Sequence, residues 1–342
     1  MTWQVLCAAP PGTVPNADLS IEAAELARLD AEVALELCAS EAEVANAGAT
    51  VDGLLTLGIG LGRQTLASLS RCRAIISISH GFNHLDIGAA TELGIPVANT
   101  YFCHEDVANH TLMLLLACAR KLTVLHQELS AGHWRRDLLD NIPPVYGQTL
   151  GLIGFGHIGS AVAQRGQVLG LKVLVFDPFV DAESLHRAGV RGVALDELLG
   201  RSDFVSLHVP WSDATHHLIG EAALRAMRPS AFLLNTARGG LVDEQALIRA
   251  LREGWIAGAG LDVFEQEPAD CANPLLTMSN VVHTPHSAGT STASLPNGRR
   301  LAAAALALAL RGIWPPHVIN PQVRSATRFP FAESEQVHAA HA

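Results

Sequence analysis

The chain has 342 residues, of which 49% are hydrophobic and 16% are charged, so it can fill two hydrophobic cores and is not intrinsically disordered as a whole. Its formal net charge of -10 and its lack of a basic block argue against a nucleic acid partner. The six cysteines form no CxxC pair and the first residues do not resemble a signal peptide, so we expect reduced thiols, a cytoplasmic location and no export. No apolar run approaches the length of about 20 residues that a membrane span needs, so no membrane partner is expected.

The first hundred residues alternate short apolar runs with helix-like stretches. Apolar runs at 4–8, 53–57, 74–79 and 96–99 predict strands, and the stretch at 22–37 is interpreted as helical. This alternation is typical of an α/β domain with a sheet between helices.

A long helix is predicted over residues 104–129. Apolar side chains recur through it, and the acidic residues Glu105 and Asp106 occupy its first turn, where they favour the start of a helix. A helix of this length can bridge two domains.

Strands and helices alternate again from residue 149 onward. Six strands are predicted, at 150–153, 172–176, 204–208, 231–235, 258–261 and 281–283. Helices fill the intervals, and crossovers of that length require parallel pairing, so residues 149–283 are predicted to form a doubly wound parallel sheet. A further helix at 298–310 precedes a proline-rich stretch, and we expect the chain to leave its first domain near residue 104 and to re-enter it after residue 287.

Gly154, Gly156 and Gly159 form a Gly-x-Gly-x-x-Gly pattern directly after a predicted strand and directly before a helix. In this context the first glycine permits a tight turn, the second lets a pyrophosphate approach the backbone, and the third lets the helix pack on the strand. The next strand ends in Asp177, whose carboxylate suits the hydroxyls of an adenosine ribose and repels a 2'-phosphate. The pattern therefore predicts NAD as the cofactor, in preference to NADP.

Polar residues follow the last three strands of the predicted sheet, namely Arg238, Glu267 and His286. Because ligands bind outside the carboxyl ends of parallel strands, we expect these side chains to converge beside the nicotinamide. An arginine suits a substrate carboxylate and carbonyl, a histidine supplies a proton near neutral pH, and a nearby carboxylate stabilises imidazolium. Each residue alone could have an ordinary structural role, and their shared place at the strand ends is what indicates a site.

The chain has 16 histidines, but they show no metal-ligand spacing. His216, His217, His338 and His341 are interpreted as solvated side chains. No metal site is predicted.

The run from Gly147 to Gly289 resembles the cofactor domain of the D-isomer-specific 2-hydroxyacid dehydrogenases. The resemblance rests on five segments in the family's order, which are GLIGFGHIG, SLHVPWSDATHHLI, LLNTARGGLVDEQAL, GAGLDVFEQEP and VVHTPHSAG. It extends more loosely to SISHGFNHLDIGAATELGIPVANT and to HVINPQV near Pro321. The segments DPF, NTARGGLVDE and WPPHVINP further resemble bacterial relatives of the C-terminal-binding proteins.

The resemblance implies two βα-rich domains. Residues 104–290 would form a Rossmann-type doubly wound sheet that binds NAD, and both chain ends, 1–103 and 291–331, would build a flavodoxin-like substrate domain that closes over it. Residues 332–342 are expected to be a disordered tail. The helix at 104–129 resembles the family's dimerisation arm, so a homodimer is expected.

The resemblance also implies roles for individual residues. Arg238 would bind the substrate carboxylate and carbonyl, His286 would be the acid/base, and Glu267 would pair with His286. Cofactor contacts are implied at Gly154, Gly156, His157, Ile158, Gly159, Asp177, His208, Val209, Pro210, Thr215, Thr236, Ala237 and Asp262. Substrate contacts are implied at Ser79, His80, Gly81 and Tyr101 besides Arg238. Tyr101 and Phe102 replace the family's usual Pro-Gly turn. The resemblance therefore does not determine which side chain the substrate carries.

The sequence is thus interpreted as an NAD-dependent oxidoreductase that transfers hydride between nicotinamide and C2 of a 2-oxo or D-2-hydroxy acid. Two alternatives stay open. One is an NAD-sensing protein with incidental turnover, like the corepressor branch, because that branch keeps the same three residues. The other is a phosphite-type dehydrogenase, for which His80 offers an extra cation.

Overall fold

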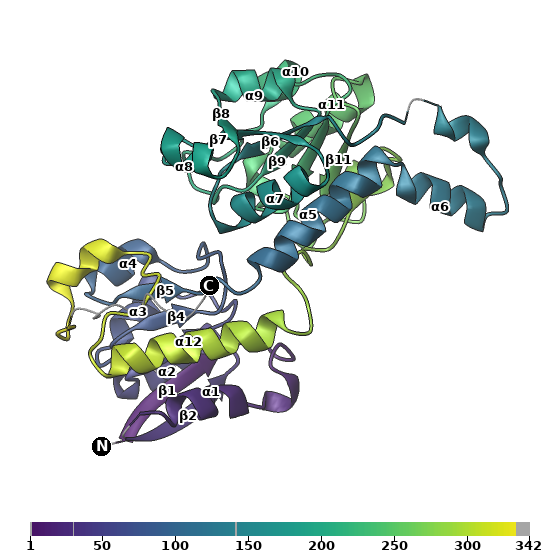
Figure 1. Cartoon of the computed structure of the whole chain (residues 1–342). Coiled ribbons are helices and arrows are strands. Elements are labelled where there is room, and N and C mark those ends of the chain that lie inside the picture. The colour runs from purple at the N-terminus through teal and green to yellow at the C-terminus, as the bar shows by residue number, and fades with distance from the viewer. Residues whose placement is uncertain (1, 30, 141, 333–342) are drawn as a thin grey trace. The chain divides into compact units, whose positions relative to one another are not determined.

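The computed structural model describes residues 2–29, 31–140 and 142–332, and the chain divides into two compact units (Figure 1). The first unit is Met1–Phe102 together with Ser291–Ala342, and the second unit is Cys103–Thr290. Residues 333–342 of the predicted tail lie outside the described residues.

The first unit contains a five-stranded parallel sheet with the strand order β2-β1-β3-β4-β5, which is the flavodoxin-like order. Its strands are β1 (Thr2–Ala8), β2 (Glu32–Cys38), β3 (Gly53–Thr56), β4 (Ile75–Ser77) and β5 (Val97–Asn99). Its helices are α1 (Ser20–Leu26), α2 (Glu41–Ala47), α3 (Arg63–Ser68), α4 (Ile87–Glu92) and α12 (Ser294–Leu310), with short 3-10 helices η1 (Pro15–Ala17), η2 (Gly48–Thr50) and η6 (Pro321–Ala326). The predicted flavodoxin-like sheet is confirmed.

Helix α12 returns from the far end of the chain and completes the core of the first unit. Ala302 and Leu306 of this helix are buried against the sheet. Gly53 of β3 permits the close approach, because a Cβ there would lie 2.8 Å from Leu306 Cδ1. Arg299 of α12 also forms a buried ion pair with Glu22 of α1, in which Nε lies 2.6 Å from Oε1. The two chain ends therefore share one core.

Residues 22–37 were interpreted as helical, and this prediction is wrong for their second half. Helix α1 ends at Leu26, and β2 begins at Glu32 and pairs in parallel with β1 along its whole length. The alanines, glutamates and leucines of this stretch favour a helix locally. Val33, Leu35 and Leu37 nevertheless alternate with exposed neighbours and form the half-buried side of an edge strand. Strand pairing thus overrides the local helix preference.

The second unit contains a seven-stranded parallel sheet with the order β12-β11-β10-β9-β6-β7-β8. Its strands are β6 (Thr149–Ile153), β7 (Lys172–Phe176), β8 (Arg191–Gly192), β9 (Phe204–Leu207), β10 (Phe232–Asn235), β11 (Gly258–Leu261) and β12 (Val281–His283). Its helices are α5 (His104–Ala119), α6 (Leu122–Ser130), α7 (His157–Val168), α8 (Ala182–Arg187), α9 (Leu195–Arg201), α10 (Glu221–Ala226) and α11 (Glu244–Glu253), with η3 (Arg136–Leu139), η4 (Gly239–Leu241) and η5 (Pro274–Thr277). The predicted Rossmann-type doubly wound sheet is confirmed.

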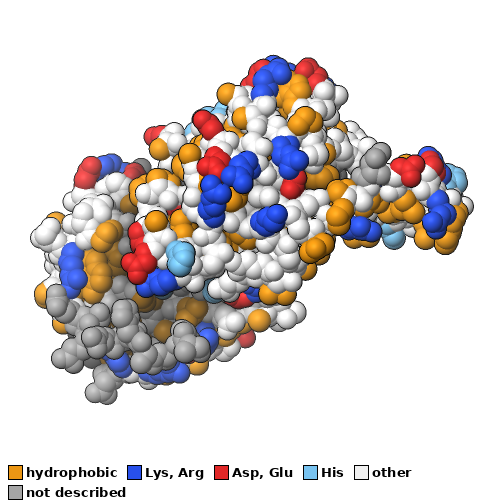
Figure 2. All heavy atoms as spheres, turned by 45° about the horizontal axis from the view of Figure 1, so that its top comes forward, with side chains coloured by type: hydrophobic (Ala, Val, Ile, Leu, Met, Phe, Trp, Pro, Cys, Tyr) orange, Lys and Arg blue, Asp and Glu red, His pale blue; other side chains and the backbone are white. Residues whose placement is uncertain are grey.

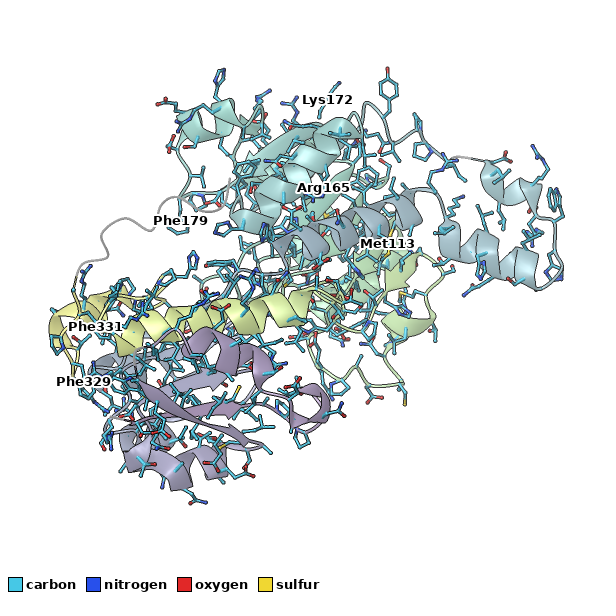
Figure 3. All side chains as sticks on the ribbon, turned by 60° about the horizontal axis from the view of Figure 1, so that its bottom comes forward. Met113, Arg165, Lys172, Phe179, Phe329 and Phe331 are labelled. Atoms are coloured by element: carbon cyan, nitrogen blue, oxygen red, sulfur yellow. The ribbon has the colours of Figure 1, made fainter. Side chains whose placement is uncertain are left out.

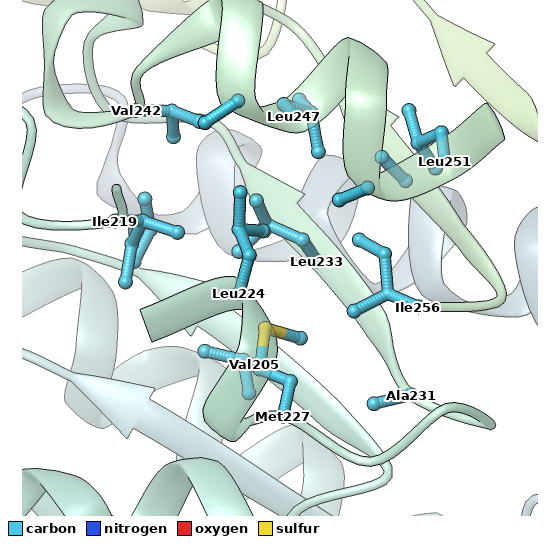
Figure 4. Close-up of a cluster of buried hydrophobic side chains, with 14 of the residues drawn as sticks. Val205, Ile219, Leu224, Met227, Ala231, Leu233, Val242, Leu247, Leu251 and Ile256 are labelled. Atoms are coloured by element: carbon cyan, nitrogen blue, oxygen red, sulfur yellow. The ribbon is translucent and has the colours of Figure 1, made fainter. Parts of the chain in front are cut away.

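Two hydrophobic clusters cover the two faces of this sheet. In the cluster of Figure 4, Leu224 of α10 and Leu247 of α11 pack against Leu233 of β10. The other cluster lies between the opposite face and helices α5 and α7. Because the strands are covered on both faces, they form continuous apolar runs, which made them visible in the sequence.

The helix predicted at 104–129 is two helices, α5 and α6, so the prediction of one continuous helix is wrong. Lys121 lies between them with a φ of 52°. Its Nζ donates hydrogen bonds to Leu138 O at 3.1 Å and to Asp140 O at 3.3 Å. The left-handed residue ends α5 and redirects the chain, and its side chain holds the segment that returns after η3.

Residues 122–139, from α6 to η3, project from the second unit and are named the arm (Figure 1). Leu122, Leu129 and Trp134 of the arm are 58%, 57% and 77% exposed. Hydrophobic side chains are visible on the arm at the right of Figure 2. The arm therefore carries apolar surface that its own unit leaves uncovered. Among the described residues, no helix has the length and apolar character needed to cross a bilayer.

Candidate active site

Three loops of the second unit begin where the neighbouring strands β10, β11 and β12 end. Arg238 lies in the loop after β10, Glu267 in the loop after β11, and His286 in the loop after β12. Because the strands run parallel, all three loops leave the sheet at the same edge. The structure thus brings the three predicted residues into one region.

Glu267 and His286 form a hydrogen-bonded pair. Glu267 Oε2 lies 2.6 Å from His286 Nδ1, and Glu267 Oε1 accepts a 3.0 Å hydrogen bond from the backbone N–H of Phe264. Burial opposes ionisation of Glu267, but the hydrogen bonds from His286 and Phe264 and the charges of His286 and Arg238 outweigh it, so the pKa of Glu267 is lowered. Glu267 is therefore a carboxylate at neutral pH, and Nε2 is the ring nitrogen of His286 that Glu267 does not use.

Arg238 is held by the backbone around it. The buried side chain of Asn235 donates from Nδ2 to Arg238 O at 2.8 Å and accepts from Ala237 N at 3.0 Å. Burial lowers the pKa of Arg238, and the charge of Glu267 acts in the opposite direction. Since a guanidinium stays protonated at every pH a protein tolerates, the site keeps a permanent, partly desolvated cation.

Gly239 brings the loop after β10 against the loop after β11. A Cβ at Gly239 would lie 1.8 Å from Phe264 O and 2.4 Å from Glu265 N. The backbones of the two loops therefore touch where no side chain fits. This contact keeps Arg238 and Glu267 in one site.

The buried carboxylate of Asp262 organises the loop that carries His286. Its Oδ1 accepts hydrogen bonds from Thr284 Oγ1 at 2.5 Å and from Ser287 N at 2.9 Å, and its Oδ2 accepts one from Ala288 N at 2.9 Å. His286 has a φ of 51°, and its N–H donates to Asp262 O at 2.7 Å. A residue other than glycine seldom adopts a positive φ. The hydrogen bonds of Thr284, His286, Ser287 and Ala288 to Asp262 hold the backbone of His286 in this conformation and so orient its side chain.

The predicted glycine turn links β6 to α7. Gly154 has a φ of 96°, and a Cβ there would lie 2.6 Å from His208 O. A Cβ at Gly159 would lie 2.3 Å from Gly154 O, whereas a Cβ at Gly156 would meet nothing within 4 Å. Packing therefore requires the first and third glycines. The second keeps a space open at the N-terminus of α7, where a pyrophosphate fits.

Two histidines beside the turn are neutral at pH 7. Burial and the nearby His104 lower the pKa of His157, the first residue of α7. Burial lowers the pKa of His208 to about 3, and its Nε2 lies 2.9 Å from Ser206 Oγ. Neither imidazole therefore adds a positive charge at this turn, and the positive end of the α7 dipole attracts an anion there.

Asp177 follows β7 and closes the glycine turn. Its Oδ2 accepts a hydrogen bond from Phe155 N at 2.8 Å, and its Oδ1 accepts one from Phe179 N at 2.9 Å. Each oxygen has a second lone pair, which can serve a ribose hydroxyl. Phe179, which the sequence analysis did not single out, is 95% exposed beside it (Figure 3).

The other predicted cofactor residues lie at the start of α7 and after β9, β10 and β11, namely Ile158, Val209, Pro210, Thr215, Thr236, Ala237 and Asp262. Thr215 Oγ1 donates to Pro210 O at 2.8 Å and so closes the loop after β9. Thr236 Oγ1 lies 2.8 Å from Thr111 Oγ1 of α5. These residues share one sheet edge with the glycine turn.

The predicted substrate residues lie in the first unit, after β4 and β5. Ser79 Oγ donates to Gly81 O at 2.5 Å. The Tyr101 ring centroid is 5.2 Å from that of His80 and 4.8 Å from that of His317, edge-on in both cases. The structure thus groups the four predicted residues with His317, which the sequence analysis did not single out.

Other residues that position these loops were not predicted from the sequence. Asn235 and Thr284 stand next to motif residues that were named, so the motifs contained a signal for them. His110 of α5 lies with Nε2 2.9 Å from Thr284 Oγ1 and 3.6 Å from Asp262 Oδ1. Nothing in the local sequence links α5 to the loop after β12.

Comparisons with known proteins agree with this arrangement. Residues 112–288 match the family described as D-isomer specific 2-hydroxyacid dehydrogenase, NAD binding domain. The chain is 41% identical to the glyoxylate reductase of Korarchaeum cryptofilum over 264 residues, which cover 76% of this chain and 80% of that protein. It is 37% identical to the glyoxylate reductase of Thermococcus litoralis over 285 residues, which cover 81% of this chain and 86% of that protein.

A solved structure of D-lactate dehydrogenase from Aquifex aeolicus, complexed with NAD and lactic acid, is also similar. It superposes with a TM-score of 0.77 at 30% sequence identity, and the match covers 90% of this chain and 96% of that one. The family match at 112–288 includes the glycine turn and all three loops that carry Arg238, Glu267 and His286.

Replacing Asp262 tests whether its carboxylate stabilises the loop that carries His286. Asp262→Ala is expected to lower the free energy of unfolding by about 3 kcal/mol, because the buried N–H groups of Ser287 and Ala288 lose their acceptor. Urea denaturation measures this loss. Thr284→Val removes one of the three hydrogen bonds to Asp262 together with the contact between Thr284 Oγ1 and His110 Nε2, and as the comparison variant it should cost less, about 1 to 2 kcal/mol. Equal stability of Asp262→Ala and the wild type would show that the carboxylate does not organise the loop.

Proposed function

The chain belongs to the D-isomer specific 2-hydroxyacid dehydrogenase family, and we propose that it reduces a small 2-oxo acid, of the size of glyoxylate, to the 2-hydroxy acid. Its activity class is that of an NAD-dependent 2-hydroxyacid dehydrogenase. The observation that carries the proposal is the Glu267–His286 pair, with 2.6 Å between Oε2 and Nδ1, beside the cation of Arg238. The glyoxylate reductases of Korarchaeum cryptofilum and Thermococcus litoralis, to which the chain is similar, support a small substrate.

NAD, when bound, supplies or accepts the hydride at C2 of the substrate. The residues proposed to hold its pyrophosphate are Gly154, Gly156 and Gly159, since the open space at Gly156 and the start of α7 fit that group. Asp177 is proposed to accept hydrogen bonds from the ribose hydroxyls. The remaining cofactor contacts are proposed at His157, Ile158, His208, Val209, Pro210, Thr215, Thr236, Ala237 and Asp262.

His286 is proposed to move the proton. In the direction of reduction, its imidazolium donates the Nε2 proton to the carbonyl oxygen, and in the direction of oxidation its neutral ring accepts that proton from the hydroxyl. Glu267 accepts a hydrogen bond from Nδ1, which fixes the orientation of the ring. The proton is thus held at the nitrogen that faces away from Glu267.

Arg238 is proposed to bind the substrate. Its planar guanidinium can make two parallel charge-assisted hydrogen bonds to the carboxylate and can stabilise the charge that develops on the carbonyl oxygen. Arg238 is partly buried, and its partial desolvation strengthens both interactions.

Ser79, His80, Gly81 and Tyr101 are proposed to contact the substrate as well. They cluster after β4 and β5, at the sheet edge where parallel α/β units bind ligands. The large rings of Tyr101 and Phe102 favour a substrate with a short side chain.

A second copy of this chain is proposed to cover the arm and to form a homodimer. A groove of about 840 Å³ lies between α5, the start of α6 and α7, and Met113, Leu116, Leu122 and Val168 are among the residues that line it. Met113 of α5 and Arg165 of α7, both labelled in Figure 3, line this groove. Exposed apolar surface of this kind marks an interaction site.

A cytoplasmic location is proposed from the cysteines. All six are free and five are buried. Burial raises the pKa of Cys7, Cys72 and Cys118 to about 12, so these groups stay protonated thiols. Reduced cysteines are usual in the cytoplasm.

A panel of 2-oxo acids tests the proposed reaction. The purified protein is expected to consume NADH with the small members, glyoxylate or hydroxypyruvate, at a higher kcat/KM than with branched or aromatic members, as measured by NADH absorbance. Phosphite with NAD is the control for phosphite oxidation and should give no NADH. Tight NADH binding without turnover on any member would contradict the proposal and favour an NAD-sensing protein, like those that the WPPHVINP ending resembles.

Replacing His286 tests the proton path. His286→Ala is expected to lower kcat by about 10² to 10⁴-fold, because the acid/base group is lost. NADH affinity, measured by fluorescence titration, should change by less than about twofold. The matched control is His283→Ala, since His283 is an exposed histidine whose Nε2 lies 3.2 Å from Leu276 O, outside the pair. Wild-type turnover in His286→Ala would remove His286 from the mechanism.

Replacing Asp177 tests the cofactor preference. Asp177→Ala is expected to reduce the preference for NADH over NADPH by about tenfold or more, because it removes the ribose acceptor and the charge that repels a 2'-phosphate. The ratio of kcat/KM for the two cofactors measures this. Asp181→Ala should keep the wild-type ratio, since that carboxylate caps α8 by accepting from Ser184 N at 2.8 Å. A wild-type preference for NADPH would refute the role of Asp177.

Placing a charge on the arm tests the proposed dimer. Leu129→Asp is expected to convert a dimer into a monomer, because it buries a carboxylate in an apolar interface. Size-exclusion chromatography with light scattering measures the mass. Phe179→Asp introduces the same charge at an exposed apolar residue outside the arm and should leave the dimer intact. A monomeric wild-type protein would disprove the proposed assembly.

A further inference from the structure

Two adjacent histidines and a glutamate from a different loop meet on the surface of the second unit. The rings of His216 and His217 are stacked with centroids 3.8 Å apart, and His217 Nε2 lies 2.7 Å from Glu265 Oε1. One ligand-type atom from each of the three side chains lies within 4.8 Å of the others. His216 and Glu265 are exposed and His217 is partly buried, so the group is open to an ion from solvent.

The backbone positions these side chains before any ion arrives. His217 has a φ of 50°, and its N–H donates to Gly240 O at 2.9 Å. Glu265 N donates to Glu244 Oε2 at 3.1 Å, and Glu244 Oε1 accepts from Asn273 Nδ2 at 2.7 Å. The loop after β9 and the loop after β11 are therefore each tied to a third segment of the unit. The donor atoms face one another because these loops are fixed.

The donor set has the chemistry of a transition-metal site. Imidazole nitrogens and carboxylate oxygens are ligands that Zn²⁺ and neighbouring first-row dications bind in proteins. Tetrahedral bonds of about 2.1 Å place donor atoms about 3.4 Å apart. Donor atoms up to 4.8 Å apart must therefore close by up to about 1.4 Å, whereas His217 Nε2 and Glu265 Oε1, now 2.7 Å apart, must separate by about 0.7 Å. Side-chain rotation of the exposed His216 and Glu265 can supply both movements. The carboxylate of Glu265 supplies the negative charge of the donor set.

We propose that His216, His217 and Glu265 bind a divalent transition metal of the Zn²⁺ class, with the remaining position open to water. This site goes beyond the proposed dehydrogenase function, since none of the three residues is proposed to hold substrate or cofactor. No pattern in the sequence indicates it, because Glu265 reaches the two histidines from a loop after a later strand. A bound ion links the loop after β9 to the loop after β11 and so restrains the segment that leads to Glu267.

Direct metal binding to the whole chain tests the proposal. The tag-free protein, freed of metal by a chelator, is titrated with Zn²⁺ by calorimetry and with Co²⁺ by visible absorption. Loss of binding is compared in His216→Ala, His217→Ala and Glu265→Gln. One ion per protein chain is expected in the wild type, and each variant should bind the ion at least about tenfold more weakly. Zn²⁺ should raise the unfolding temperature of the wild type only, because an ion that binds the folded state stabilises it.

The control is His133→Ala. This variant removes an imidazole from a histidine–glutamate pair elsewhere in the chain, in which His133 Nδ1 lies 3.1 Å from Glu128 Oε2. It should bind Zn²⁺ like the wild type. Unfolding temperatures without metal show whether each variant is folded. The proposal is overturned if the wild type binds no Zn²⁺, or if folded His216→Ala and His217→Ala bind it as well as the wild type. The readout needs neither NADH nor turnover, so failure of the dehydrogenase proposal leaves this test intact.

Discussion

The in-register pairing of three parallel strands is the constraint on which the active site depends. Asn235, Leu261 and His283 lie side by side in β10, β11 and β12. The next residue along each strand therefore begins a loop at the same height, and the carboxylate of Asp262 meets the hydroxyl of Thr284 there. The register itself is specified by apolar packing on both faces of the sheet. The hydrophobic core thus determines where the charged groups of the site can lie.

Much of the fold could be predicted because its elements have strong local patterns. Buried parallel strands are continuous apolar runs, and the turn at Gly154, with a φ of 96°, favours a residue that has no β-carbon. The two incorrect predictions concern segments whose structure depends on distant residues. Residues 32–38 form a strand because β1 offers its edge, and α5 ends where Lys121 reaches the backbone of Leu138 and Asp140. The two-residue strand β8 is too short to leave any pattern.

The candidate site divides in the same way between local and distant information. Arg238, Glu267 and His286 could be named because each follows a recognisable strand. Among their supports, Asn235 and Thr284 adjoin motif residues that could be named, whereas the backbone N–H groups bonded to Asp262 have no sequence signature. The contact of the stacked pair at 216–217 with Glu265 could not be predicted for a related reason, since Glu265 comes from a loop after a later strand. Local sequence thus names the chemical groups, and only the folded chain shows which groups meet.

The contact at Gly239 limits how this chain can change. The carbonyl of Phe264 occupies the place that any β-carbon at residue 239 would need, and neither backbone can retreat without moving a charge of the site. In a library of random variants, residue 239 should therefore tolerate glycine alone. Evolution towards another substrate would have to proceed through side chains elsewhere, because the spacing of Arg238 and Glu267 is a property of the main chain and cannot be adjusted in small steps.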